Sequence, residues 1–148
     1  MRTTGNVLTC LLLAAPLLAG CESAGHSDRS GDPPPRPAAA VVHRTAGGGR
    51  VATEATTVGS PERLAAYLRP LSPDLRRAVR AAARRISGGA AAGLVAQVVA
   101  VGCDPVERAR VLVTDGTVRI EPVAPATTHP ECLAPVTSVA LGLAAGQQ

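Results

Sequence analysis

The spacing of apolar residues predicts two short helices in the middle of the chain. A Ser-Pro-Glu run at 60–62 combines a helix N-cap, a first-turn proline and an acid beside the helix dipole. The first helix is therefore expected to end at about residue 69, before Pro70. A Ser-Pro-Asp run at 72–74 repeats the signal, and the second helix is expected to end near residue 86, before Gly88. Its core-facing residues recur at helical spacing: Leu75, Ala78, Val79, Ala82 and Ile86.

Two later segments have the pattern of strands. The run LVAQVVAV at 94–101 is rich in β-branched residues and is apolar on both faces of a strand, apart from Gln97. This pattern favours a central strand over an edge strand. The last strand is expected at 136–143, with alternating apolar residues that point one way: Val139, Leu141 and Leu143.

A β-hairpin is predicted around Asp115-Gly116, because this dipeptide is favoured in the two-residue type I′ turn. The register set by this turn gives five facing pairs: Thr114–Thr117, Val113–Val118, Leu112–Arg119, Val111–Ile120 and Arg110–Glu121. The valine and isoleucine pairs share one apolar face. The last pair brings opposite charges together on the other face. One register thus satisfies the turn, the apolar face and the charges.

The N-terminus has the general plan of a secretory signal peptide, with Arg2 before an apolar run at 7–18 and small residues after it. The run is shorter than the ~20 residues that a membrane-spanning helix needs. Residues 18–21, Leu-Ala-Gly-Cys, resemble the lipobox of bacterial lipoproteins. The resemblance implies that a diacylglycerol is attached to Cys21, that residues 1–20 are removed, and that the protein is anchored at the extracytoplasmic face of the cell membrane. A free thiol in a secreted protein and a disulfide partner are the alternatives for Cys21.

The composition adds little about function. The basic side chains are all arginines, Phe and Trp are absent, and Ala, Gly and Pro abound. In this respect the chain resembles small lipoproteins of high-GC bacteria, so the use of arginine does not by itself indicate a function. The formal net charge of +4 is modest. Together with the expected export from the cytoplasm, this charge argues against nucleic acid as a partner.

The chain is expected to divide into three parts: a cleaved signal peptide at 1–20, the lipidated cysteine with a disordered tether at 21–59, and a small α+β domain at 60–148. The tether is rich in Ala, Gly, Ser, Thr and Pro, with prolines at 33–35 and a glycine run at 47–49. Such a segment buries too little apolar surface to offset its ordering entropy.

Cysteines flank two of the predicted strands. Cys103 follows the strand at 94–101, and Cys132 precedes the strand at 136–143. Outside the cytoplasm this pair of thiols is expected to form a disulfide, which makes the two strands antiparallel neighbours. The predicted fold class is α+β: two short N-terminal helices packed on one face of a small antiparallel four-stranded sheet, in the order 3-2-1-4. We expect this domain to be a monomer.

The second predicted helix carries a stripe of arginines, Arg76, Arg80 and Arg84, spaced four residues apart. Such a stripe attracts anionic lipid head groups by about 1 kcal/mol per basic residue near the surface. The alternative is a solvated helix face whose last-turn arginines suit the helix dipole.

Catalytic and metal-binding patterns are weak in this chain. The residues that come nearest to a metal site are His129, Glu131, Cys132, Cys103 and Asp104. They lack the paired spacing of zinc ligands, and a disulfide would consume both thiols. The residue types of a catalytic triad are present as Ser138, His129 and either Asp104 or Asp115. The sequence around the serine, however, is not that of a nucleophile elbow. We therefore expect no enzymatic activity, no cofactor and no metal.

The segment 123–131 is stiffened by prolines and held at its end by Cys132. It suits an ordinary connection between strands, or a loop that presents an extended peptide to a protease. The function expected from the sequence is a membrane-anchored extracytoplasmic lipoprotein that acts as a non-enzymatic binding or envelope module for an unidentified protein or envelope ligand. A protease-inhibitor-like module is the alternative, and a small hydrolase is third.

Overall fold

The computed structural model describes residues 35–38, 40–87, 92–124 and 131–144. These residues form two helices and two antiparallel sheets, one of three strands and one of four. The elements in chain order are β1 (Arg36–Pro37), β2 (Ala40–Thr45), β3 (Thr56–Thr57), α1 (Pro61–Leu68), α2 (Pro73–Ser87), β4 (Leu94–Gly102), β5 (Ala109–Thr114), β6 (Thr117–Pro122) and β7 (Val136–Leu143). The expected signal peptide and Cys21 lie outside the described residues.

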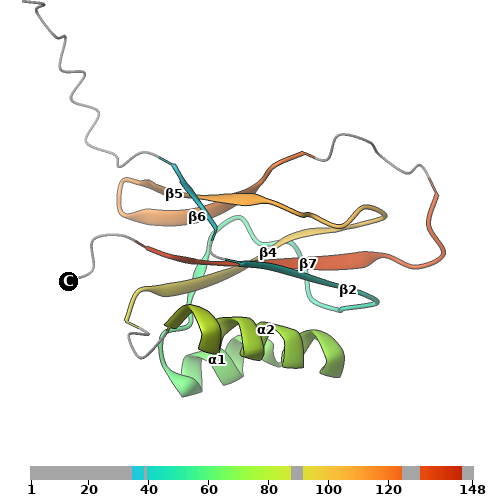
Figure 1. The fold of residues 1–148 in the computed structure, drawn as a ribbon, viewed down its shortest axis with the longest axis horizontal. Helices are drawn as coiled ribbons and strands as arrows, with labels where there is room; N and C mark the ends of the chain where they lie inside the picture. Colours follow the sequence, from blue (N-terminus) through green and yellow to red (C-terminus); the bar gives the residue numbers. More distant parts are fainter. Residues whose placement is uncertain (1–34, 39, 88–91, 125–130, 145–148) are drawn as a thin grey trace, which may run out of the picture. The chain divides into compact units, whose positions relative to one another are not determined.

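The described elements stack in three layers, with the four-stranded sheet in the middle (Figure 1). Helices α1 and α2 cover one face of this sheet, whose order is β2-β7-β4-β3, and the sheet β1-β5-β6 covers the other face. Strand β4 takes part in both cores: Leu94, Ala96 and Val98 lie beneath the helices, and Val95 and Val99 lie between the sheets. Because successive side chains of a strand point to opposite faces, β4 has to be apolar on both. The predicted central strand is confirmed.

Both helices occupy the predicted segments. The Oγ of Ser60 accepts a hydrogen bond from the backbone N–H of Arg63 at 3.2 Å, and the Oγ of Ser72 accepts one from the N–H of Leu75 at 3.4 Å. These serines satisfy backbone donors that a helix leaves free in its first turn. The buried face of α2 includes three residues of the expected set: Leu75, Val79 and Ala82.

The hairpin of β5 and β6 has the predicted register in all five pairs. Asp115 and Gly116 have positive φ angles of 49° and 78°, as a type I′ turn requires. Arg110 lies opposite Glu121, but the ion pair of Glu121 is made with Arg119, two residues earlier in the same strand. Local sequence therefore determines the turn and the register, while the charge pairing differs from the prediction.

The predicted single sheet in the order 3-2-1-4 is wrong. Strands β4 and β7 are antiparallel neighbours, as expected, but the hairpin does not extend their sheet. The remaining edge of β4 is occupied by β3, with Thr57 opposite Val95. The hairpin instead stacks on the face of the sheet and buries Val111 and Ile120 there. Stacking covers the second apolar face of β4, which edge pairing would leave in water.

The prediction of a disordered tether is wrong for residues 40–58. Strand β2 pairs with β7 along its whole length, from Ala40 opposite Leu141 to Thr45 opposite Val136. Neighbouring valines at 41 and 42 point into the two opposite cores. Composition alone missed this strand because its stability comes from pairing with a segment far away in the sequence. Residues 21–34 lie outside the described residues.

The glycine run at 47–49 makes a close contact and is not a flexible break. The carbonyl of Gly47 accepts a hydrogen bond from the N–H of Ser72 at 2.7 Å. A Cβ at Gly47 would lie only 2.7 Å from Cδ2 of Leu75, and the next two glycines have φ angles of 71° and 81°. Only glycine fits this approach without strain. The run joins the end of β2 to the turn between the helices.

Candidate functional site

A pocket of about 300 Å³ opens between the two helices and the start of β4. Helices α1 and α2 lie side by side on the same face of the four-stranded sheet (Figure 1). Most of the lining is apolar: Val58, Pro61, Leu64, Ala65, Ala83 and Leu94. Gly59 and Ser60 complete it on one side, and two cations, Arg80 and Arg84, complete it on the other. The lining thus combines apolar side chains with charge of one sign.

The helical repeat explains why these residues meet. The lining residues of each helix are three and four positions apart and share one face: Pro61, Leu64 and Ala65 in α1, and Arg80, Ala83 and Arg84 in α2. Two of them, Ala65 and Ala83, end at Cβ. Space that longer side chains would fill between the helices therefore stays open.

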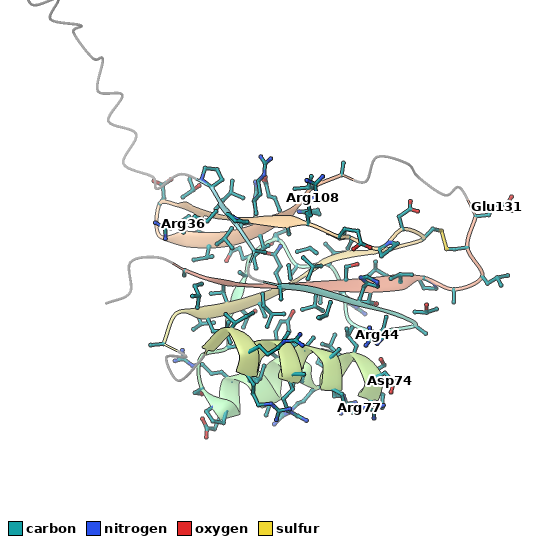
Figure 2. The ribbon with its side chains drawn as sticks, viewed as in Figure 1. Arg36, Arg44, Asp74, Arg77, Arg108 and Glu131 are labelled. Atoms are coloured by element: carbon teal, nitrogen blue, oxygen red, sulfur yellow. A yellow bond between two sulfur atoms is a disulfide. The ribbon has the colours of Figure 1, made fainter. Side chains whose placement is uncertain are left out.

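The arginines of α2 have different partners. The Nε of Arg76 donates a hydrogen bond at 2.7 Å to a backbone carbonyl in the turn between the helices. Arg77 forms an ion pair with Asp74 near the start of α2 (Figure 2). Arg80 and Arg84 are exposed, and neither has a hydrogen bond or ion pair with any described residue. The three arginines of the predicted stripe therefore have different positions. Arg76 is bonded to the turn between the helices, whereas Arg80 and Arg84 line the pocket.

The acid nearest to the pocket in sequence is Glu62, in the first turn of α1. Hydrogen bonds from the Glu62 backbone and from the Ser60 hydroxyl hold the pKa of this carboxyl below its ordinary value. Glu62 is therefore ionised at neutral pH, but it does not line the pocket. The two charged side chains among the described lining residues are both cationic.

The disulfide between Cys103 and Cys132 is confirmed, with the two Cα atoms 5.2 Å apart. It joins the end of β4 to the segment before β7, close to Glu131 (Figure 2). Both thiols that the weak metal pattern would have used are consumed by this bond. The described residues contain no cluster of three or more His, Cys, Asp or Glu side chains that could hold a metal ion, and His129 lies outside them.

Of the candidate triad residues, Ser138 lies in β7, Asp104 follows Cys103 after β4, and His129 lies outside the described residues. Ser138 is fully buried, and its Oγ accepts a hydrogen bond from the backbone N–H of Val106 at 3.0 Å. Asp115 lies in the hairpin turn. A histidine that was not among the predicted site residues, His43 in β2, lies opposite Ser138 and has a buried Nδ1 without a partner among the described residues. Only the pairing of β2 with β7 reveals this neighbour.

The expected inhibitor loop at 123–131 is described only at its ends. The N–H of Val123 donates a hydrogen bond to the carbonyl of Arg108 at 2.9 Å, and Cys132 is held by the disulfide. Residues 125–130 lie outside the described residues. The protease-inhibitor hypothesis stays a prediction.

Neither helix in the described residues has the length and apolar composition that crossing a membrane requires. Comparison of the chain with protein-family models, curated proteins and solved structures finds no match.

The pocket was not predicted from the sequence either. Pro61 was expected in the first turn of a helix, as the structure has it, and Leu64 lies in the next turn of the same helix. Their shared position on the pocket wall depends on how α1 lies against α2. The alanines Ala65 and Ala83 were the available signal, since small residues on facing helices leave space, but the sequence does not show that they face each other.

Proposed function

We propose that this protein is a lipid-anchored binding module at the extracytoplasmic face of the cell membrane, without enzymatic activity, and that its ligand occupies the pocket between α1 and α2. The observation that carries the binding role is the apolar pocket with two arginines, Arg80 and Arg84, that have no partner among the described residues. The Leu-Ala-Gly-Cys run that ends at Cys21 supports the anchor.

The composition of the pocket supports small-molecule binding. Sites for small ligands are concave and mostly apolar, with a few polar groups that orient the ligand. Other pockets in the described part of the structure have a more polar or more charged lining. The one beside the hairpin turn is lined mainly by polar side chains, among them Thr53, Glu54 and Asp115. The one beside β1 carries charges of both signs, including Glu107 and Arg108.

Binding in this pocket can be tested with a neutral apolar dye, N-phenyl-1-naphthylamine, whose fluorescence rises in apolar surroundings. The full chain is expected to bind the dye, and Ala65→Phe is expected to weaken binding at least about tenfold because the ring fills the pocket. Ala66→Phe is the matched control: Ala66 is also exposed on α1 but does not line the pocket. If the wild-type chain does not bind the dye, or if both variants bind it as the wild type does, the proposed binding role is wrong.

A further inference from the structure

We propose that the pocket between α1 and α2 binds a fatty acid, with the acyl chain against the apolar lining and the carboxylate between Arg80 and Arg84. This inference rests on the proposed function, since it names the class of ligand that the same pocket takes. It is carried by the volume of the pocket, by its lining and by the charges at its rim.

The volume fits one acyl chain. At about 300 Å³ the pocket stands at the lower end of the range of roughly 300–1,000 Å³ that is usual for small-ligand sites. Pro61, Leu64 and Leu94 present only hydrocarbon to an occupant. A lipid with two chains has no room here, whereas a single chain removes its methylene groups from water.

Two cations at the pocket, each without a partner in the described part of the chain, are placed to bind one carboxylate. Arg80 and Arg84 are four residues apart on α2, which brings their Cβ atoms to within about 5–6 Å of each other. Each guanidinium offers paired N–H donors that match the two oxygens of a carboxylate. Both side chains are exposed and unpaired among the described residues. A carboxylate at this rim would be held by both.

The surrounding groups favour a negative head group over a neutral or positive one. The described part of the lining contains no acid. Asp74, at the start of α2, is paired with Arg77, and the Glu62 carboxylate is bonded to its own backbone and to the Ser60 hydroxyl. The hydroxyl of Ser60 already accepts the N–H of Arg63 and bonds to Glu62. The pocket therefore offers little to a polar neutral ligand, such as a sugar, and repels a cationic amphiphile.

The test compares three probes that share a ten-carbon chain: decanoate, decanol and decyltrimethylammonium. The full chain carries Cys21→Ser, so that no acyl group of its own enters the pocket. Each probe displaces N-phenyl-1-naphthylamine below its micelle-forming concentration. Decanoate is expected to bind about tenfold more tightly than decanol, because charge-assisted hydrogen bonds at a solvent-exposed rim are of this order. Decyltrimethylammonium is expected to bind more weakly than decanol.

Substitution of the arginines shows whether the preference arises at this rim. The double variant Arg80→Gln and Arg84→Gln is expected to bind decanoate and decanol equally and to keep the wild-type affinity for decanol. Arg85→Gln is the matched control, since Arg85 is exposed on α2 but does not line the pocket. It should keep the preference. Raising NaCl to about 0.5 M should reduce the preference in the wild type, because salt screens exposed charges.

Three results would overturn the fatty-acid proposal. The first is equal affinity of the wild type for decanoate and decanol, in which case the pocket still binds apolar ligands and the proposed function stands. The second is a preference that survives the double variant. The third is displacement of the dye by lysophosphatidylglycerol but not by decanoate, which would assign the rim to a phosphate head group. Failure of the dye itself to bind is a separate result, and it overturns the proposed function.

Discussion

Tyr67 carries a polar atom into the core beneath the helices. Its ring packs against the buried residues of this core, and its hydroxyl is buried without a hydrogen-bond partner among the described residues. Burial raises the pKa of Tyr67 above its ordinary value of 10.0, because the phenolate would lose its hydration. The folded protein therefore keeps this proton under alkaline conditions that ionise an exposed tyrosine.

Tyr67→Phe is expected to raise the free energy of unfolding by about 1 kcal/mol at neutral pH, since a buried polar group without a partner is destabilising by ~1–3 kcal/mol. The phenylalanine ring keeps the apolar packing. Urea unfolding followed by circular dichroism measures the difference. A loss of stability in the variant would show that the hydroxyl has a partner.

The same substitution has a definite pH signature. As pH rises above 10.0, the ordinary pKa of tyrosine, the unfolded chain releases the Tyr67 proton while the folded chain retains it. Stability therefore falls in the wild type, by up to about 1.4 kcal/mol over one pH unit. Tyr67→Phe removes this part of the fall. The chain has one tyrosine, so tyrosinate absorbance reports the ionisation directly, and its appearance in the folded protein near pH 10.0 would contradict the prediction.

Polar residues within the strands had no explanation in the sequence. Gln97 interrupts an otherwise apolar run at 94–101. The apolar residues around it predicted a central strand, but they gave no role for the glutamine. In the structure its Oε1 accepts the N–H of Ile120 at 2.6 Å, and its Nε2 donates to the carbonyl of Ala52 at 2.7 Å. The polar interruption thus satisfies two backbone groups that come from distant parts of the chain.

At the scale of elements, the hydrogen bond from Ile120 joins β4 to β6 across the core between the two sheets. The bond to Ala52 joins β4 to the segment before β3. The bond from Val106 to the Oγ of Ser138 makes a second connection, to β7. Hydrophobic contact between stacked sheets is not directional. Buried hydrogen bonds, in contrast, are satisfied in one alignment only, so they select how the hairpin lies on the middle sheet.

Gln97→Leu keeps a branched side chain of similar volume but removes both polar atoms, which leaves the Ile120 N–H and the Ala52 carbonyl without these partners. The free energy of unfolding is expected to fall by at least about 2 kcal/mol, because each unsatisfied buried group is destabilising by ~1–3 kcal/mol. Val101→Leu, at an exposed position of the same strand, serves as the control and should change stability by less than about 0.5 kcal/mol. Equal stability of Gln97→Leu and the wild type in urea would refute the bridging role.

The elements that follow from local sequence were predicted well, and the others were not. The hairpin turn depends on two residues, Asp115 and Gly116, and its register follows from the turn. Both helices have serine caps and proline starts within the sequence. Strand β2 has no such local signal, because its backbone partners lie in β7. Because the sequence of β2 has no local strand signal, its residues were assigned to the tether.

At the scale of the whole molecule, the folded part begins closer to the N-terminus than predicted, because it includes β1 and β2. Its first described strand begins at Arg36, whereas the predicted domain begins at residue 60. The connection between the proposed lipid at Cys21 and the folded part is correspondingly shorter than expected.

The anchor itself predicts where the protein is found. Cys21→Ser is expected to move the protein out of the membrane fraction or to leave it unprocessed, because two acyl chains give stable anchoring. Cys10→Ser is the matched control, since Cys10 lies in the apolar run that is removed with the signal peptide. Mass spectrometry of the wild type should show an acylated N-terminus at Cys21. Normal membrane retention of Cys21→Ser would disprove the anchor.

The sequence by itself determined the features that depend on residues close together in the chain. These are the two helices with their caps, the hairpin with its register, and the central and last strands. The pairing of Cys103 with Cys132 also followed, once an oxidising compartment was inferred from the lipobox resemblance. Each rests on local hydrogen bonds, on side-chain periodicity or on a choice among few partners.

Only the tertiary structure decided how these elements meet. It placed the hairpin on the face of the middle sheet, added β2 to the edge of β7, and brought Pro61 and Leu64 to Arg80 and Arg84. Burial of apolar surface drives all three arrangements, and it depends on area and not on sequence order. The pocket, and with it the proposed ligand, arises where two helices with alanines on their facing sides do not fill the space between them.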